Sequence, residues 1–120
     1  MRIAYAIIFV SDMDRSVAFY RDVVGMPLKF ASSHWSEFAT EGATWALHLA
    51  EAPARPSEGS EAAGTSRPGF SVADLDAFHA RMLEQEVICS QPPRETFGTR
   101  IAQYQDPDGL VFSVSEERAF

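Results

Sequence analysis

Short apolar segments alternate with polar turns along most of the chain. Residues 3–10 form a dense apolar run, rich in β-branched and aromatic types, that ends in a Ser-Asp pair, which predicts a buried strand. Asp12 or Asp14 is then expected to cap a helix. The apolar positions of this helix recur at helical spacing until Gly25 ends it. Three further strands are predicted, at 28–34, 35–40 and 45–49.

The same pattern starts again after a polar stretch. Residues 51–66 contain no aromatic residue and no Val, Ile or Leu, so they are expected to form a flexible, solvated connector. Beyond them, the motif Val-x-Asp-(Met/Leu)-Asp of residues 10–14 recurs at 72–76, again between an apolar segment and a helical pattern. We therefore predict a single domain made of two duplicated modules, residues 1–50 and 67–120. Three strands are expected to complete the second module, at 87–89, 99–105 and 110–115.

Composition and charge narrow the functions that the chain can have. The 120 residues are 46% hydrophobic, enough for one core, and no apolar run approaches the ~20 residues of a membrane span. Seventeen acidic and ten basic residues leave a net charge of −7, which argues against nucleic acid and against an anionic membrane surface. The lone Cys89 cannot form an internal disulfide, and the apolar N-terminus has the pattern of a strand rather than a signal peptide. Both features favour the cytoplasm.

Three motifs resemble the vicinal oxygen chelate superfamily, which includes glyoxalase I, bleomycin-resistance proteins and extradiol dioxygenases. Residues 10–26 resemble its opening strand and helix, residues 46–49 (Ala-Leu-His-Leu) its fourth strand, and residues 106–109 (Asp-Pro-Asp-Gly) its C-terminal signature. The resemblance implies an α+β fold in which paired βαβββ modules form a half-barrel cleft, with the helices outside. It also implies a homodimer, for which the large aromatic residues are candidate contacts: Trp35, Trp45 and Phe97.

Enzymes of this superfamily hold a divalent metal with side chains from the first and fourth strands of each module. The resemblance implies that these positions are Tyr5, His48, Arg67 and Ser113. Only His48 is a good ligand, because the permanent charge of Arg67 opposes a cation and the Ser113 hydroxyl is a weak neutral donor. Spacing about the 40–45 hairpin predicts that Glu37 faces His48, but this adds no third ligand. We therefore expect neither a metal nor another cofactor.

Period-two alternation predicts which side chains face the cleft. If Tyr5 faces the cleft, Ile7 and Phe9 face it too, and Ile8 and Val10 pack under the helix. The strand 99–105 leaves open which of its faces lines the cleft. Aromatic walls with a few polar groups are typical of a ligand pocket. The candidate ligand-binding residues are Tyr5, Phe9, Trp35, Glu37, His48, Arg67 and Ser113.

Two functions from different classes remain open. The first is a metal-free protein that binds a small aromatic or cationic compound, as antibiotic-binding members of the superfamily do. The second is a glyoxalase- or dioxygenase-like enzyme (a lyase, isomerase or dioxygenase), either metal-dependent with unusual ligands or metal-free with His48 as base and Glu37 orienting it. We favour binding, with a small molecule and a second copy of the chain as the partners. Structural roles also stay open: Tyr5 can fill the space of a metal, and an ion-pair cluster can form from Glu37, His48 and Arg67.

Overall fold

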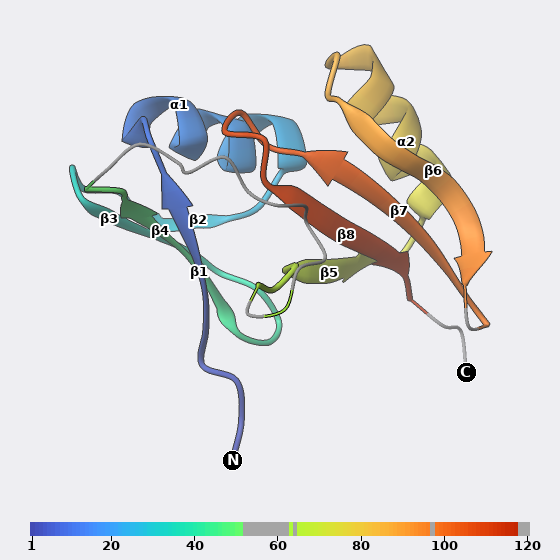
Figure 1. Ribbon diagram of the computed structural model, residues 1–120, viewed down its shortest axis with the longest axis horizontal. Coiled ribbons are helices and arrows are strands. Elements are labelled where there is room, and N and C mark those ends of the chain that lie inside the picture. The colour runs from blue at the N-terminus through green and yellow to red at the C-terminus, as the bar shows by residue number, and fades with distance from the viewer. Residues whose placement is uncertain (52–62, 64, 97, 118–120) are drawn as a thin grey trace. The chain divides into compact units, whose positions relative to one another are not determined.

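The chain divides into two compact units, Met1–Arg55 (unit 1) and Pro56–Phe120 (unit 2). A computed structural model describes residues 1–51, 63, 65–96 and 98–117. Each unit contains its own four-stranded sheet and its own helical segment, and together these account for the labelled elements of Figure 1. Most of the predicted connector, 51–66, and the candidate dimer residue Phe97 lie outside the described residues.

Unit 1 has the predicted βαβββ order. Its sheet runs β1-β4-β3-β2, with β1 parallel to β4 and the other pairs antiparallel. Asp12 caps the helix by accepting the backbone N–H of Arg15 (3.1 Å). The helix ends at Gly25, whose φ of 90° is the left-handed conformation that glycine adopts without strain. The elements are β1 (Tyr5–Val10), α1 (Met13–Ala18), its π-helical continuation η1 (Phe19–Val24), β2 (Leu28–Phe30), β3 (Trp35–Phe38) and β4 (Thr44–Leu49).

Unit 2 repeats this order, with a sheet that runs β5-β8-β7-β6. Asp74 caps α2 as Asp12 caps α1, accepting the N–H of Ala77 (3.0 Å). The elements are β5 (Gly69–Val72), α2 (Leu75–Glu84), β6 (Cys89–Thr96), β7 (Thr99–Gln105) and β8 (Val111–Glu116). The predicted strand 87–89 is wrong in extent, because β6 continues through Pro92 and Pro93. An edge strand tolerates prolines where its ladder is irregular, as this one is between Gln91 and Arg94.

The first and last strands of the two units are joined in the same way. Val10 O accepts the N–H of Ala50 in unit 1, and Val72 O accepts the N–H of Glu117 in unit 2, both at 2.8 Å. Because the helix caps also match, residues of β1 correspond to residues of β5, and residues of β4 to residues of β8. The duplicated βαβββ plan is therefore confirmed, and the chain has two four-stranded mixed sheets.

Aromatic residues form the core of unit 1 between the sheet and the helix. The Tyr20 ring lies 6.1 Å from Phe38 and 5.4 Å from Trp45, between ring centroids. Trp45 is only 3% exposed, so it belongs to this core. Its alternative role as a dimer contact is wrong, because its register on β4 turns the indole toward the helix.

Unit 2 has an equivalent core under α2. Phe112 is fully buried, with its ring centroid 5.7 Å from Phe70 and 6.0 Å from Tyr104. Phe78 of α2 packs on the same cluster, 5.6 Å from Tyr104. Among the described residues, no helix is both long and apolar enough to cross a membrane.

Candidate functional site

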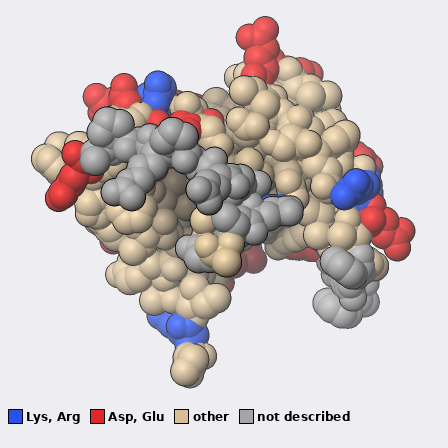
Figure 2. Space-filling model, in the orientation of Figure 1, with Lys and Arg blue, Asp and Glu red and all other residues tan. Residues whose placement is uncertain are grey.

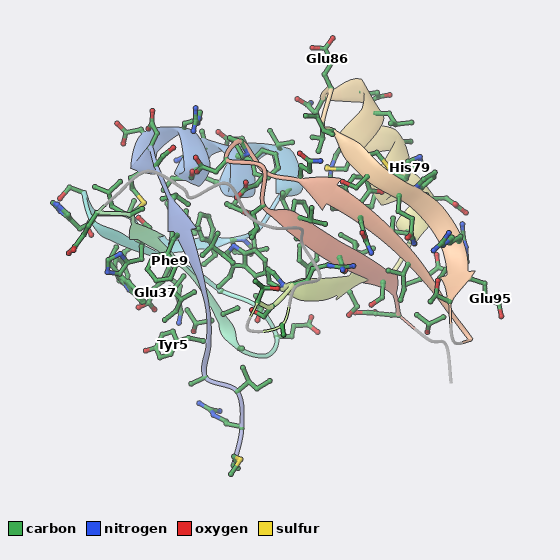
Figure 3. All side chains as sticks on the ribbon, viewed as in Figure 1. Tyr5, Phe9, Glu37, His79, Glu86 and Glu95 are labelled. Atoms are coloured by element: carbon green, nitrogen blue, oxygen red, sulfur yellow. The ribbon has the colours of Figure 1, made fainter. Side chains whose placement is uncertain are left out.

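One face of the unit 1 sheet carries exposed aromatic side chains. On β1, Tyr5, Ile7 and Phe9 are 51%, 46% and 65% exposed, whereas Ile8 and Val10 are 4% and 0% exposed. This alternation is the predicted one, and it follows from the period of two along a strand. Figure 3 shows Tyr5 and Phe9 on the same side of β1. The sheet thus packs one face on the helix and leaves the other open.

The neighbouring strands add two more rings to this open face. Phe9 and Trp35 both lie opposite His48 in the ladders that β4 makes with β1 and β3. The His48 ring centroid is 5.3 Å from Phe9 and 5.9 Å from Trp35, and Trp35 lies 6.2 Å from Tyr5. We call the surface made by Tyr5, Phe9, Trp35 and His48 the aromatic surface. Its rings meet in tilted or edge-on arrangements, which aromatic pairs favour.

The predicted pairing of Glu37 with His48 is wrong. The ladder places Ala46 opposite Glu37 and Trp35 opposite His48, a shift of two residues along the hairpin. A shift of two preserves the face, so Glu37 still lies on the open side of the sheet. Its Oε2 accepts the Trp35 Nε1–H (2.8 Å), and its Oε1 lies 3.7 Å from the Lys29 ammonium. His48 Nδ1 instead bonds the Leu49 carbonyl oxygen (2.8 Å).

The open face of unit 2 is chemically different. It carries a hollow of about 390 Å³, and we call this the serine hollow. Its lining residues come from β5, β7 and β8: Gly69, Phe70, Ser71, Ile101, Ser113 and Ser115. A Cβ on Gly69 would lie 3.3 Å from the Ser113 carbonyl oxygen, so the close approach of β5 and β8 favours glycine there. Hydroxyl groups thus take the place that rings hold in unit 1.

The orientation of the 99–105 strand, which the sequence leaves open, is fixed by its contacts. Tyr104 is fully buried against α2, and Arg100 on the same face pairs with Asp76 of α2 (2.7 Å). Ile101 therefore faces the serine hollow. The Arg100 guanidinium donates to the Asp76 carboxylate and so lowers the pKa of Asp76. The candidate Arg67 lies half-buried just before β5.

A partly buried polar pair in unit 2 was not predicted from the sequence. The Nδ1 of His79 lies 2.9 Å from the Tyr104 hydroxyl, and burial raises the pKa of that phenol. Cys89 lies opposite Tyr104 on the ladder, and burial raises the pKa of the thiol. The thiol is therefore a weak nucleophile at neutral pH, in keeping with the strand role that its sequence context favours. The contact between His79 and Tyr104 depends on how α2 packs on β7, which no local motif reports.

The residues that the resemblance implies as metal positions offer few ligands for a divalent ion. Among the described residues, no three His, Cys, Asp or Glu side chains converge to hold one. His48 is the one good metal ligand on the aromatic surface. The nearby Glu37 carboxylate is already held by the Lys29 ammonium and the Trp35 N–H. Tyr5 and Ser113 offer hydroxyls, which are poor ligands for such ions.

The visible charges fit the acidic composition. Figure 2 shows acidic side chains in several small groups, with a few basic ones among them and wide uncharged areas between. Outside the grey residues, this face of the molecule carries no broad basic patch of the kind that binds nucleic acid.

Known proteins share both the sequence pattern and the fold. The YaeR protein of Escherichia coli K12 is 29% identical over 118 residues, covering 92% of each chain. A crystal structure of a protein of unknown function from Agrobacterium tumefaciens is 27% identical, with a TM-score of 0.77 over 98% of this chain and 95% of that one. A lactoylglutathione lyase of the same organism superposes with a TM-score of 0.72 over 95% and 92% of the two chains. At 20% identity this last likeness shows the fold alone.

The family model of the Glyoxalase/Bleomycin resistance protein/Dioxygenase superfamily matches residues 2–114. This range includes every element of unit 1, those of unit 2 as far as Val114 within β8, and every candidate site residue. The chain therefore belongs to the Glyoxalase/Bleomycin resistance protein/Dioxygenase superfamily.

Proposed function

We propose that this protein binds a small planar aromatic compound on the aromatic surface of unit 1 without using a divalent metal. The observation that carries the proposal is the exposure of Tyr5 and Phe9 beside Trp35 and His48 on one open sheet face. Exposed rings of this kind lose water when a flat apolar ligand stacks on them, which favours binding. An antibiotic with an aromatic system is one such ligand.

The geometry favours an aromatic ligand over a cationic one. Glu37 is the acidic group of this face, and its carboxylate is held by the Lys29 ammonium at 3.7 Å and the Trp35 N–H at 2.8 Å. A carboxylate that already has a cation and a donor attracts a further cation weakly. The five candidate residues of unit 1 thus divide into four that offer ring contacts and Glu37, which positions the Trp35 indole.

In unit 2, Ser113 and its neighbours are proposed as a polar contact surface that is separate from the site of the aromatic compound. Three hydroxyls, those of Ser71, Ser113 and Ser115, line the hollow of about 390 Å³, and hydroxyls both donate and accept hydrogen bonds. Arg67 precedes the first strand of this surface and would supply a positive charge next to it.

We also propose a cytoplasmic homodimer. Ile3 and Phe30 are 77% and 46% exposed in addition to the aromatic surface, and apolar exposure of this extent is typical of an interaction surface. The single cysteine is free, as expected in a reducing compartment. Light scattering of the purified protein should give twice the chain mass, and a mass of 13.3 kDa at micromolar concentration would contradict the dimer.

The binding proposal is tested by fluorescence in a Trp45→Phe background, in which Trp35 is the remaining tryptophan. Proflavine and acridine-9-carboxylate serve as planar probes of opposite charge. Either probe should quench Trp35, with little preference for the cation, and prior dialysis against EDTA should leave the affinity unchanged. Quenching by neither probe, or binding that requires added zinc or nickel, would contradict the proposal.

A further inference from the structure

The hydrogen bond of His48 fixes which of its ring nitrogens can accept a hydrogen bond from a ligand. Its Nδ1 lies 2.8 Å from the Leu49 carbonyl oxygen. A carbonyl oxygen only accepts hydrogen bonds, so the proton of the neutral imidazole must sit on Nδ1. The lone pair is then on Nε2, which has no hydrogen-bond partner among the described residues. The neutral ring therefore offers an acceptor and no second donor.

This acceptor lies between two aromatic rings. His48 is half-buried, 5.3 Å from Phe9 and 5.9 Å from Trp35 between ring centroids, and perpendicular to the Trp35 indole. Such packing restricts the imidazole to one orientation. An acceptor held in this way selects a ligand by the position of its hydrogen-bond donor. The His48 ring does not rotate to reach a donor that lies elsewhere on the ligand.

The other polar groups beside His48 are already paired. The Trp35 Nε1–H donates to Glu37 Oε2 at 2.8 Å, and Glu37 Oε1 faces the Lys29 ammonium at 3.7 Å. Neither Trp35 nor Glu37 can donate a hydrogen bond to Nε2. A ligand that covers Nε2 without donating to it would leave a buried acceptor without a hydrogen bond. This costs more binding free energy than losing a hydrogen bond that water can replace.

From these contacts we infer that the ligand is an aromatic ring that bears a hydroxyl or N–H donor, and that this donor bonds His48 Nε2 while the ring stacks on Phe9 and Trp35. The inference rests on the proposed function, since it names the class of compound bound at the aromatic surface. It makes His48 a specificity-determining residue that discriminates an aromatic hydroxyl from its methyl ether. The hydrogen bond consumes no co-reactant and leaves the proton on the ligand.

Equilibrium dialysis with two matched pairs of probes tests this discrimination. The pairs are 2-naphthol with 2-methoxynaphthalene, and indole with 1-methylindole, so that one arm reports hydroxyl donors and the other N–H donors. The native protein should bind the donor of at least one pair about fivefold more tightly than its methylated partner, the size of one net hydrogen bond. In His48→Phe, which keeps a flat ring between Phe9 and Trp35, that preference should vanish. His34→Phe removes the other histidine of unit 1, whose ring bonds the Ser33 hydroxyl, and should keep it.

A measurement on the native protein makes the test independent of how well the variant folds. Long-range proton–nitrogen spectra of the labelled protein report the tautomer directly, and His48 should show a protonated Nδ1 and a bare Nε2. The Nε2 signal should move when the preferred donor probe is added and stay in place with its methylated partner. A protonated Nε2 in the neutral ring, or equal binding within both pairs, would overturn the inference and leave the aromatic-surface proposal standing. Binding of no probe at all would overturn the proposed function as well.

Discussion

Phe9 beside His48 in unit 1 and Ser71 beside Ser115 in unit 2 occupy the same place in the same fold. Both pairs join the first strand of a unit to its last, at equal distance from matching backbone hydrogen bonds. On the opposite faces, Ile8 beside Leu47 corresponds to Phe70 beside Val114, and all four are apolar. At these positions the helix-facing sides of both sheets are apolar. The open sides differ, with rings in unit 1 and hydroxyl groups in unit 2.

This difference separates the residues that the fold requires, on the helix-facing sides, from those available for function, on the open sides. A helix-facing residue at these central strand positions must fill a packed interior, which restricts it to apolar types of suitable volume. An open-face residue is free of that demand. Rings on one open face and hydroxyls on the other therefore indicate two contact surfaces of different chemistry, and the aromatic one is where we place ligand binding.

The largest expected difference comes from truncating one helix-facing phenylalanine of unit 2 and one open-face phenylalanine of unit 1. Phe112→Ala should lower the free energy of unfolding by about 3–5 kcal/mol, because it empties a fully buried site next to Phe70. Phe9→Ala should change the free energy by less than about 0.5 kcal/mol, since the ring is 65% exposed. Urea denaturation followed by circular dichroism measures both. Similar losses in the two variants would mean that the open face is also a packing face.

Ligand affinity should show the reverse order. Phe9→Ala should weaken 2-naphthol binding about tenfold, the effect of losing one stacking ring. Ser71→Ala changes the matching position of unit 2 and should leave the affinity within about twofold of native. Equilibrium dialysis of both variants checks this, and a larger loss in Ser71→Ala would move the site to the serine hollow.

The two helix caps should respond alike, because the units share their architecture. Asp12→Ala and Asp74→Ala each remove one carboxylate that accepts an N–H three residues on, at 3.1 and 3.0 Å. Each variant should lower the free energy of unfolding by about 1 kcal/mol. Asp14→Ala, which leaves the Asp12 cap in place, is the control and should lower it little. Thermal and urea unfolding of the three variants measures the difference. A cap that proves dispensable in one unit alone would show that the repeats differ in stability as well as in surface chemistry.

The smallest expected effect concerns Cys89 in unit 2. Burial raises the pKa of its thiol, so a smaller fraction is thiolate at neutral pH and alkylation is slowed. The rate of reaction with iodoacetamide should rise through an inflection above the ordinary thiol value of about 8.5, and unfolding in urea should restore the ordinary profile. An inflection below that value in the native protein would show that the thiol is activated instead.

Alternation alone was sufficient to predict which residues of each strand share a face. It places Tyr5, Phe9, Trp35 and His48 on one open side, because the period of a strand is two. It could not find the offset of the β3–β4 hairpin, since a shift of two residues leaves every face unchanged. Glu37 was therefore expected beside His48, whereas the ladder places it beside Ala46.

Features that depend on contacts between distant segments were beyond the sequence. The bond between His79 and Tyr104 requires α2 to lie on β7 in a particular rotation. The extension of β6 through Pro92 and Pro93 requires it to be an edge strand. A strand order is set by long-range pairing, which local propensity does not report.

The central claim is that the open face of unit 1 binds an aromatic ligand without a metal. The most direct test is a nuclear magnetic resonance titration of EDTA-treated, isotope-labelled protein with 2-naphthol. We expect shift changes at the Tyr5 and Phe9 rings and at the Trp35 indole, with the signals of Ser71 and Ser113 left in place. Changes confined to the serine hollow, or changes that appear only after zinc or nickel is added, would contradict it.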